Sequence, residues 1–422
     1  MVDKDSVVVS VVVPVFNVAE FLEECLDSIA AQTHPNLEII CVDDGSTDGS
    51  RAIIESRARL DMRISLLTQT HSNAGVARNL GLKAATGDFL AFLDSDDYFE
   101  PDYVEKLLAA ALRFDADIVA CRSSTISYKT GMHADITWAL PLIASNVPFV
   151  PRDLADLFNQ FVGWPWDKLF RRSLIQREHL WFQSLGSTND AYFVYTGLWL
   201  ANTMVIIDDR LVHHRVDNPR SIESTRQWGD FFRASDAIER RLRLEDIWDR
   251  AKPSFLRWVV KYCMWSIRTL PDASSAKMAA RLIHRIDTGD AEVSDAIGTD
   301  GSRYLNLIQS APTKVALELM DMEYENTVYS RRLADTQSQL RDAETKLTDT
   351  EQLLSENQTA RAYAEQLTMS QDAQIASLES QLSRYAFVIR PIRTVNRVRR
   401  LVAAWLRENA SLTRRRARSR VK

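Results

Sequence analysis

Short apolar runs alternate with segments of helical periodicity along the first part of the chain. The apolar runs are dominated by Val, Ile, Leu and Phe, which is typical of strands that are buried on both faces. In the segments between them, apolar residues recur every three or four positions, which is typical of helices. This alternation predicts an α/β fold with a mostly parallel sheet flanked by helices. The expected strands are 6–16, 37–44, 64–69 and 89–94, and the expected helices are 18–32, 48–60 and 75–85.

The pattern changes after this alternation ends. Residues 150–225 are less regular and rich in aromatic side chains, and residues 226–330 have helical periodicity. Residues 331–385 contain no Gly or Pro, and Leu recurs every seven residues from Leu333 to Leu354, which is typical of a coiled coil. Most of the partner positions are polar or small, so a solvated single helix or a disordered linker is the alternative. The predicted parts are an α/β domain over 1–225, a helical region over 226–330, a coiled coil over 331–385 and a basic tail over 386–422.

The overall composition is that of an ordinary soluble protein. The chain has 422 residues, of which 45% are hydrophobic and 26% charged. Its four cysteines include no C-x-x-C pair, so neither a zinc site nor a disulfide framework is indicated. The first residues include acidic side chains and lack a small-residue cleavage site, and no apolar run is long enough to span a bilayer. We therefore expect a cytoplasmic protein.

Charge is distributed unevenly along the chain. Residues 386–422 hold twelve Arg or Lys and one Glu, a net charge of +11, so the other residues carry −16 of the total of −5. A basic tail on an acidic body is typical of proteins that bind a polyanion or a membrane surface. We expect no nucleic-acid partner, because no folded recognition module accompanies the tail.

The tail also has the pattern of an amphipathic helix that starts near Ile392, after a proline. Its apolar side would carry Trp405, and arginines would gather on the other side, although Arg399 falls on the apolar side. Such a helix is suited to lie in a membrane interface, which would make the protein peripheral on the inner face of the cell membrane. A solvated, disordered end is the alternative. The apolar side consists of Ile392, Val395, Val398, Leu401, Val402, Trp405 and Leu406, and the basic side of Arg393, Arg397, Arg400 and Arg407.

Polar residues follow three of the expected strands. In open α/β sheets, ligands bind at the carboxyl ends of the strands, so these residues are candidates for a site. Well-formed strand-to-helix turns are the alternative, since Asp, Ser and Gly are common in turns. The chain has no G-x-G-x-x-G and no Walker sequence, which removes the main support for a dinucleotide site or a P-loop. The three segments are PVFN at 14–17, VDDGSTDGS at 42–50 and DSDD at 94–97.

Taken together and in this order, these segments resemble the family 2 glycosyltransferases, which have the nucleotide-sugar-binding fold called GT-A. The resemblance is close over residues 8–120, looser over 160–225, and it lapses beyond that. It implies a GT-A fold and a nucleotide-sugar donor. The segments that carry it are VSVVVPVFNVAEFLEECLDSIAAQ, CVDDGSTDGS and NAGVARNLGLKAATGDFLAFLDSDD.

The resemblance implies which residues bind the donor. Phe16 stands where the family commonly has Tyr, and its ring can still stack on a nucleobase. Asp44 would accept a hydrogen bond from the base, with Asp43 beside it as a weaker candidate, and Arg78 suits phosphate contact. A segment containing His214 resembles a family loop over the diphosphate. The nucleotide-sugar candidates are Pro14, Phe16, Asn17, Asp43, Asp44, Arg78, Asn79, Asp94, Ser95, Asp96, His214 and Arg215.

The acidic segment Asp94-Ser95-Asp96 matches the metal-binding D-x-D pattern of the family. Residues two apart on an extended chain point the same way, so Asp94 and Asp96 can face one site while Asp97 turns aside. Neighbouring carboxylates repel one another, and a cation relieves that repulsion. Hard oxygen ligands suit Mg²⁺ or Mn²⁺, which we expect as the cofactor.

A sugar transfer also needs a base for the acceptor hydroxyl. In the family a Glu-Asp pair opens a helix, and here Asp190 falls in the Asp position while Asn189 replaces the Glu. A helix-capping Asp is the alternative. The segment WPWDKLF resembles the acceptor-side part of the family, which makes Trp164, Trp166 and Lys168 acceptor-side candidates. For the two indoles, buried core is the alternative.

The leading hypothesis is an inverting, metal-dependent glycosyltransferase with a UDP-linked donor. Its acceptor would be a hydroxyl of a glycan or a lipid-linked glycan, in the synthesis of a cell-surface polysaccharide. A sugar nucleotidyltransferase would need a Gly-rich, basic phosphate loop after the first strand, and PVFNVAEFLEE provides none. A non-catalytic sugar-nucleotide-binding or scaffold protein is the other alternative, with 331–385 joining copies into a homo-oligomer.

Overall fold

The computed structural model describes residues 6–218, 227–270, 272–286 and 291–310, together with short helical fragments between 336 and 380. Residues up to 302 form one compact unit, and the fold described below is the fold of this unit. The predicted coiled coil over 331–385 falls mostly outside the described residues, and the tail over 386–422 falls wholly outside them. The domain boundaries at 225, 330 and 385 stay predictions.

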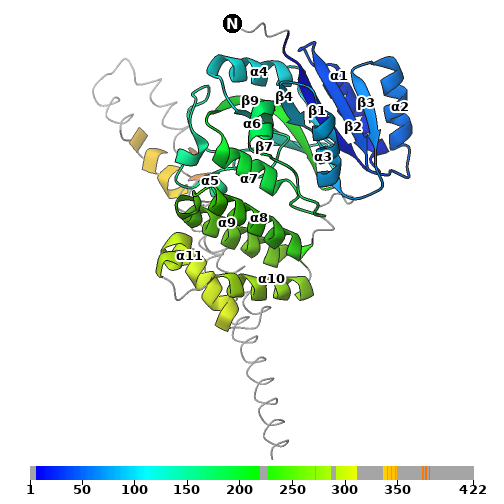
Figure 1. Cartoon of the computed structure of the whole chain (residues 1–422). Coiled ribbons are helices and arrows are strands. Elements are labelled where there is room, and N and C mark those ends of the chain that lie inside the picture. The colour runs from blue at the N-terminus through cyan, green and yellow to red at the C-terminus, as the bar shows by residue number, and fades with distance from the viewer. Residues whose placement is uncertain are drawn as a thin grey trace, which may run out of the picture. The chain divides into compact units, whose positions relative to one another are not determined.

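The first half of the chain forms the elements that its pattern predicts. Its four strands pair in parallel in the order β3-β2-β1-β4, and the helices connect them (Figure 1). Every expected strand and helix is present within a few residues of the predicted ends. The elements are β1 (Val9–Val15), α1 (Ala19–Ala30), β2 (Leu37–Asp43), α2 (Ser50–Leu60), β3 (Ile64–Thr68), α3 (Ala74–Ala84) and β4 (Phe89–Phe92).

The second half extends this sheet, but with mixed strand directions. Beyond β4 the order is β8-β6-β9-β5, and β7 pairs with β6. Strand β8 runs antiparallel to both of its neighbours, whereas β6 and β9 are parallel. The elements are β5 (Tyr98–Phe99), α4 (Tyr103–Phe114), β6 (Ile118–Ser127), β7 (His133–Ile136), the 3-10 turn Pro151–Asp153, α5 (Leu157–Gln160), β8 (Lys168–Arg171), α6 (Arg172–Arg177), α7 (Ala191–Leu200) and β9 (Met204–Val216).

The expectation of a mostly parallel sheet is therefore wrong for the sheet as a whole. It holds for β1 to β4, where each connection is a crossover helix, as parallel neighbours require. Strand β8 enters between β4 and β6 after a long irregular segment, and an antiparallel strand needs no such crossover. The described part of the chain has an α/β fold with a mixed sheet, in which four strand pairings are parallel and four are antiparallel.

Side chains alternate between two cores on the two faces of the sheet, as strand geometry requires. The odd-numbered valines of β1, such as Val11, join one core cluster with residues of α1, α2 and α4. On the other face, α3 crosses β1 so closely that a Cβ at Gly81 would collide with Val12. The same face holds a cluster of Phe rings that includes Phe92 and Phe193. These two cores fix the strand ends that carry the polar segments.

The helical region packs on the sheet domain through aromatic side chains. Trp258 of α9 stacks on Phe158 of α5, with 5.4 Å between the ring centroids. Ser254 of α9 accepts a hydrogen bond from the Phe158 amide at 3.0 Å. Figure 1 shows α8 and α9 beside α7. The helices of this region are α8 (Trp228–Leu244), α9 (Trp248–Thr269), α10 (Asp272–Arg285) and α11 (Ala291–Ser310).

Within the described ranges, no helix combines the length and the apolar composition that crossing a membrane would require.

Candidate active site

The polar segments after β1, β2 and β4 meet at one edge of the sheet. Strand β1 lies between β2 and β4 and is parallel to both. Its last residue, Val15, pairs with Asp43, and Val12 pairs with Phe92, so the three strands end close together. This is the edge where ligands bind in open α/β sheets. The sequence therefore places its candidate residues at one location, as expected.

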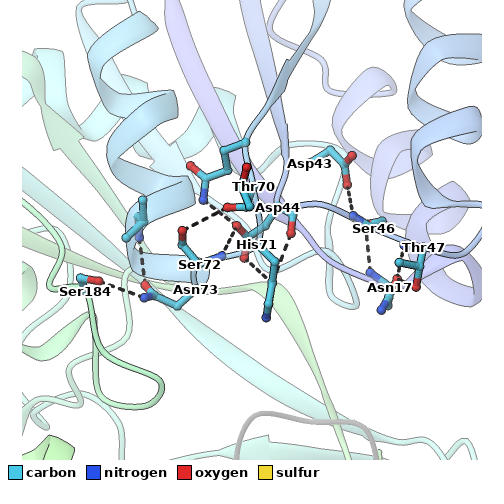
Figure 2. A network of polar contacts seen from close by, with 12 residues as sticks. Asn17, Asp43, Asp44, Ser46, Thr47, Thr70, His71, Ser72, Asn73 and Ser184 are labelled. Carbon is cyan, nitrogen blue, oxygen red and sulfur yellow. Dashed lines mark hydrogen bonds and ion pairs between the residues drawn. The ribbon is translucent and has the colours of Figure 1, made fainter.

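The loops after β1 and β2 are tied together by Asn17, as Figure 2 shows. Its Oδ1 accepts hydrogen bonds from the amides of Thr47 at 2.7 Å and Asp48 at 3.3 Å. Asp43 accepts a hydrogen bond from the Ser46 amide at 3.0 Å. Asn17 and Asp43 thus use their side chains to shape the loops. Pro14 is buried within β1 and contributes to the same scaffold.

The carboxylate of Asp44 is held by the segment that follows β3. Its Oδ1 accepts hydrogen bonds from Gln69 Nε2 at 2.6 Å and from the Ser72 amide at 2.8 Å. Its Oδ2 lies 3.0 Å from Nδ1 of His71 (Figure 2). The side chain of Asp44 is only 3% exposed. Asp44 therefore organises the loop after β3 before any ligand binds.

Beside Asp44, two partly exposed aromatic rings are stacked on each other. The rings of Phe16 and His71 are stacked, with centroids 3.9 Å apart and an angle of 17° between their planes. Phe16 is 42% exposed, and the side chain of His71 is 55% exposed. The sequence reasoning missed His71, although a polar segment after β3 at the same sheet edge could have indicated it. A planar ligand can stack on such rings.

The three aspartates of the acidic segment after β4 differ in exposure. The Asp97 amide donates to the Asp94 carbonyl at 3.0 Å, which closes a turn. Asp94 and Asp96 are partly exposed, whereas Ser95 is buried between them. The carboxylate of Asp97 is buried and accepts hydrogen bonds from His214 Nδ1 at 2.8 Å and the Arg215 amide at 2.7 Å. Asp97 thus turns away and anchors β9.

Burial and like charges shift the pKa values in this turn. Burial, with the nearby carboxylates of Asp97 and Asp94, raises the pKa of Asp96 to about 7. For His214, burial by itself would lower the pKa, but the Asp97 carboxylate and the other two aspartates raise it to about 9. His214 is therefore an imidazolium at neutral pH, and its charge partly offsets the acidic turn.

The D-x-D segment supplies two partly exposed carboxylates. Among the described residues, no group of three or more His, Cys, Asp or Glu side chains is arranged to hold a metal ion. Mg²⁺ is commonly bound by one or two carboxylates together with phosphate oxygens. Asp94 and Asp96, with the raised pKa of Asp96, fit a cation that is bound in that way. They do not form a cage that would hold a metal through protein ligands alone.

Arg78 connects the acidic turn to the start of α7. Its guanidinium pairs with Asp94 and donates from Nη1 to Asn189 Oδ1 at 2.7 Å. Helix α3 can approach the Gln183 backbone closely because Gly75 has no side chain. A Cβ at this position would collide with the carbonyl of Gln183. Arg78 is buried, with 4% of its surface exposed. Asn189 therefore still accepts a hydrogen bond from Arg78, at the position where family 2 glycosyltransferases have Glu.

Asp190 occupies the N-cap position of α7, but its side chain makes no capping hydrogen bond. Asp190 as a residue is partly exposed. Burial raises its pKa to about 6, with Asp94 adding to the shift and Arg78 opposing it. A carboxylate with a pKa near the working pH, and without a partner in the helix, is suited to general-base chemistry. The helix-capping alternative is not supported by this geometry.

Three other candidates have side chains that are bound within the protein. Asn79 exchanges two hydrogen bonds with the backbone of Phe182, at 2.7 and 2.8 Å. Lys168 is completely buried and donates to the Trp164 carbonyl at 2.8 Å and to Asp167. Arg215 donates to Glu24 at 2.7 Å. Their contacts hold the loops of the site together. The amine of Lys168 in particular is used up in these contacts and is not available to bind an acceptor sugar.

The two tryptophans of the WPW segment differ in exposure. Trp166 is 2% exposed and belongs to the core cluster, and its ring contacts those of Trp164, at 4.7 Å, and His214, at 5.2 Å. Trp164 is partly exposed. The buried-core alternative thus applies to Trp166, while Trp164 packs against the edge of the core and keeps part of its surface exposed.

Comparisons with known proteins identify relatives of this chain. The family model described as "Glycosyl transferase family 2" matches residues 10–178. A Bacillus subtilis protein named as a glycosyltransferase, EpsH, is 36% identical over 214 residues, which are 49% of this chain and 60% of EpsH. A second B. subtilis protein, TuaG, named for teichuronic acid biosynthesis, is 44% identical over 101 residues, which are 24% of this chain and 40% of TuaG. The chain thus spans about three fifths of the length of EpsH.

A solved structure shows the same fold over a longer stretch. The crystal structure of S. aureus TarS 1–349 in complex with UDP-GlcNAc superimposes with a TM-score of 0.62 and 18% identity, covering 75% of this chain and 92% of that chain. The likeness to TarS is a likeness of fold. The family match and the relatives named as glycosyltransferases identify the first part of the chain: residues 10–178 form a glycosyl transferase family 2 domain.

Proposed function

We propose that this protein is an inverting glycosyltransferase that moves a sugar from a UDP-linked donor to a hydroxyl of a glycan or a lipid-linked glycan. The observation that carries the proposal is the position of Asp190. Its uncapped carboxylate opens α7, its pKa is raised to about 6, and Arg78 lies between it and the D-x-D segment. A base and a candidate donor site thus share one sheet edge.

The exposed rings of Phe16 and His71 are the proposed seat of the nucleobase. They lie beside Asp44, whose carboxylate fixes the loop around them. The fold neighbour TarS was crystallised with UDP-GlcNAc, which supports a UDP-linked donor for this chain. The name of TuaG, together with its similarity to this chain, supports a role in the synthesis of a cell-surface polysaccharide.

Asp94 and Asp96 would hold Mg²⁺ or Mn²⁺ together with the diphosphate of the donor. The chemistry that the cation supplies there is neutralisation of the leaving nucleoside diphosphate. Asp190 takes the proton from the acceptor hydroxyl while the oxygen of that hydroxyl attacks the anomeric carbon of the donor sugar. The new bond joins that oxygen to the anomeric carbon, and the bond between the anomeric carbon and the phosphate oxygen breaks. Attack from the face opposite the leaving group inverts the configuration.

Release of UDP from a panel of UDP-sugars tests the proposal. Purified protein is incubated with each donor and Mn²⁺, with and without EDTA, and UDP is measured with water or a glycan as the acceptor. We expect at least one donor to release UDP in a manner that EDTA suppresses. No release from any nucleotide sugar by correctly folded protein would contradict the proposal.

The second candidate is a protein that binds a sugar nucleotide without transferring the sugar. The observation that favours it is Asn189, since a neutral amide stands where the family has a carboxylate. The same panel separates the two functions, because a binding protein would be stabilised against heat by its donor without releasing UDP.

The basic tail supports a location at the inner face of the cell membrane as a further part of the proposal. Its sequence predicts an amphipathic helix with a net charge of +11 over 386–422. Attachment there would bring the domain to lipid-linked acceptors.

A further inference from the structure

An exposed tryptophan, Trp138, lies next to the candidate site, and the proposed function assigns it no role. Trp138 is 65% exposed and follows β7 in an irregular segment. Its position is nevertheless fixed, because Ala139 and Leu140 are buried and the Ala139 carbonyl accepts a hydrogen bond from the Val162 amide at 3.0 Å. The Trp138 ring lies 5.4 Å from the ring of Trp164, with 63° between their planes.

The Trp138 ring adjoins a cluster of aromatic side chains at the acidic turn. Trp164 and Trp166 are stacked, and the His214 ring lies 5.9 Å from the first and 5.2 Å from the second. His214 is bound to Asp97, the residue after the D-x-D segment. The cluster therefore connects the exposed indole of Trp138 to the place where the donor diphosphate is proposed to bind.

The same segment also packs against the start of α7. A Cβ at Gly163, the residue before Trp164, would lie 3.5 Å from the Cα of Ala191 and 3.1 Å from the ring of Tyr195. Ala191 directly follows Asp190, the proposed base. The backbone directly before Trp164 thus lies close to the residue that follows the proposed base.

We propose that Trp138 and Trp164 form a corner that holds a pyranose ring of the acceptor. The C–H face of a pyranose packs on an indole, while its hydroxyls stay at the edge where they can meet water or Asp190. Two rings at 63° can contact a sugar on two sides. The acceptor is then a carbohydrate, recognised through a sugar ring rather than through a lipid chain or a small polyol. The inference rests on the proposed function, since it specifies the acceptor side of that site.

Saturation-transfer NMR on the full chain, without any donor, tests the corner. The probes are methyl β-D-glucopyranoside, methyl β-D-galactopyranoside and the methyl β-glycoside of N-acetylglucosamine, with glycerol as the polyol. The variants are Trp138→Ala, Trp138→Phe and, as the matched control, Trp265→Ala, which removes another exposed indole, 44% exposed, from α9.

We expect ring C–H signals from at least one glycoside and none from glycerol. Trp138→Ala should lower the affinity about threefold to tenfold, the usual range for one aromatic contact. Trp138→Phe should restore most of the affinity, and Trp265→Ala should leave it unchanged. Circular dichroism confirms that each variant is folded.

Several results would overturn the inference. These are equal signals in wild type and Trp138→Ala, equal signals from glycerol, no glycoside signal at all, or loss of binding to lipid vesicles as the only effect of Trp138→Ala. Because no donor is present, the outcome is independent of UDP release. A protein that binds glycosides through Trp138 but releases no UDP would contradict the proposed function and leave the corner standing.

Discussion

Single residues decide the chemistry, and Asp190 is the first to test. Asp190→Asn keeps the shape of the side chain but cannot accept a proton, so transfer should fall by about two to four orders of magnitude. Donor binding should be kept, because the carboxylate faces the acceptor in the proposed mechanism. UDP release and calorimetric titration with UDP measure the two effects. A variant that turns over at nearly the wild-type rate would require another base.

The raised pKa of Asp190 predicts the acid limb of the pH profile. The base works as the carboxylate, and its pKa of about 6 means that the protonated, inactive form prevails below that pH. The quantity kcat/KM, which reports the pKa values of the protein before substrate binds, should therefore level off above about pH 6 and fall about tenfold per pH unit below it. A kcat/KM that is constant down to pH 5 would rule out this titration.

Asp96 tests the cation site separately from the base. Asp96→Ala removes one of the two partly exposed carboxylates of the D-x-D segment, so the part of UDP affinity that depends on Mn²⁺ should be lost. Titration with UDP in Mn²⁺ and in EDTA measures it. Asp135→Ala is the matched control, because Asp135 pairs with Arg210 at the surface of β7. Unchanged UDP affinity in Mn²⁺ for Asp96→Ala would remove this residue from the site.

Motifs predicted which strand ends carry the site, but not which side chains remain open. Asp94, Asp96 and Asp190 are partly exposed, as the roles proposed for them require. Lys168 belongs to the same resemblance, yet its amine is buried by backbone carbonyls from its own loop. His71 was missed because its importance comes from a stack with Phe16, 55 positions earlier in the sequence. Such contacts depend on tertiary packing, which local spacing does not encode.

At the scale of elements, predictability follows burial. Strands β1 and β2 are nearly all buried, so their apolar runs stand out, and helix α1 between them has one buried apolar stripe. Strand β8 has only four residues and enters the sheet antiparallel, which no periodicity indicates. Helix α7 is apolar almost all round, because it is covered by the sheet on one side and by α8 on the other.

Helices α8 and α9 should be needed for the sheet domain to fold. They cover Phe158 and Tyr195, whose rings contact Trp258 at 5.4 and 4.9 Å. A fragment of residues 1–225 would expose these rings and should aggregate, whereas residues 1–310 should stay monomeric and bind UDP. Light scattering and thermal denaturation compare the two fragments. A monomeric 1–225 fragment with the same melting temperature would show that the helices are dispensable.

At the scale of the whole molecule, the chain combines an acidic body with a basic tail. Each basic residue near an anionic membrane adds about 1 kcal/mol of attraction, so several together can hold the protein there. The full chain should sediment with anionic vesicles but not with zwitterionic ones, and removal of 386–422 should abolish this. Sedimentation with both kinds of vesicle, or with neither, would contradict an electrostatic anchor.

The structure also bears on how enzymes of this kind could be recombined. Asp230 of α8 is buried and accepts hydrogen bonds from the Ser187 amide at 2.8 Å and the Ser187 hydroxyl at 3.2 Å, three residues before Asp190. The helical region therefore holds the segment that carries the proposed base. A chimera joined near residue 225 would combine a base from one parent with a support from the other. The sheet domain should instead be exchanged together with α8 and α9. The loop that carries the proposed base then keeps the helix whose Asp230 holds it.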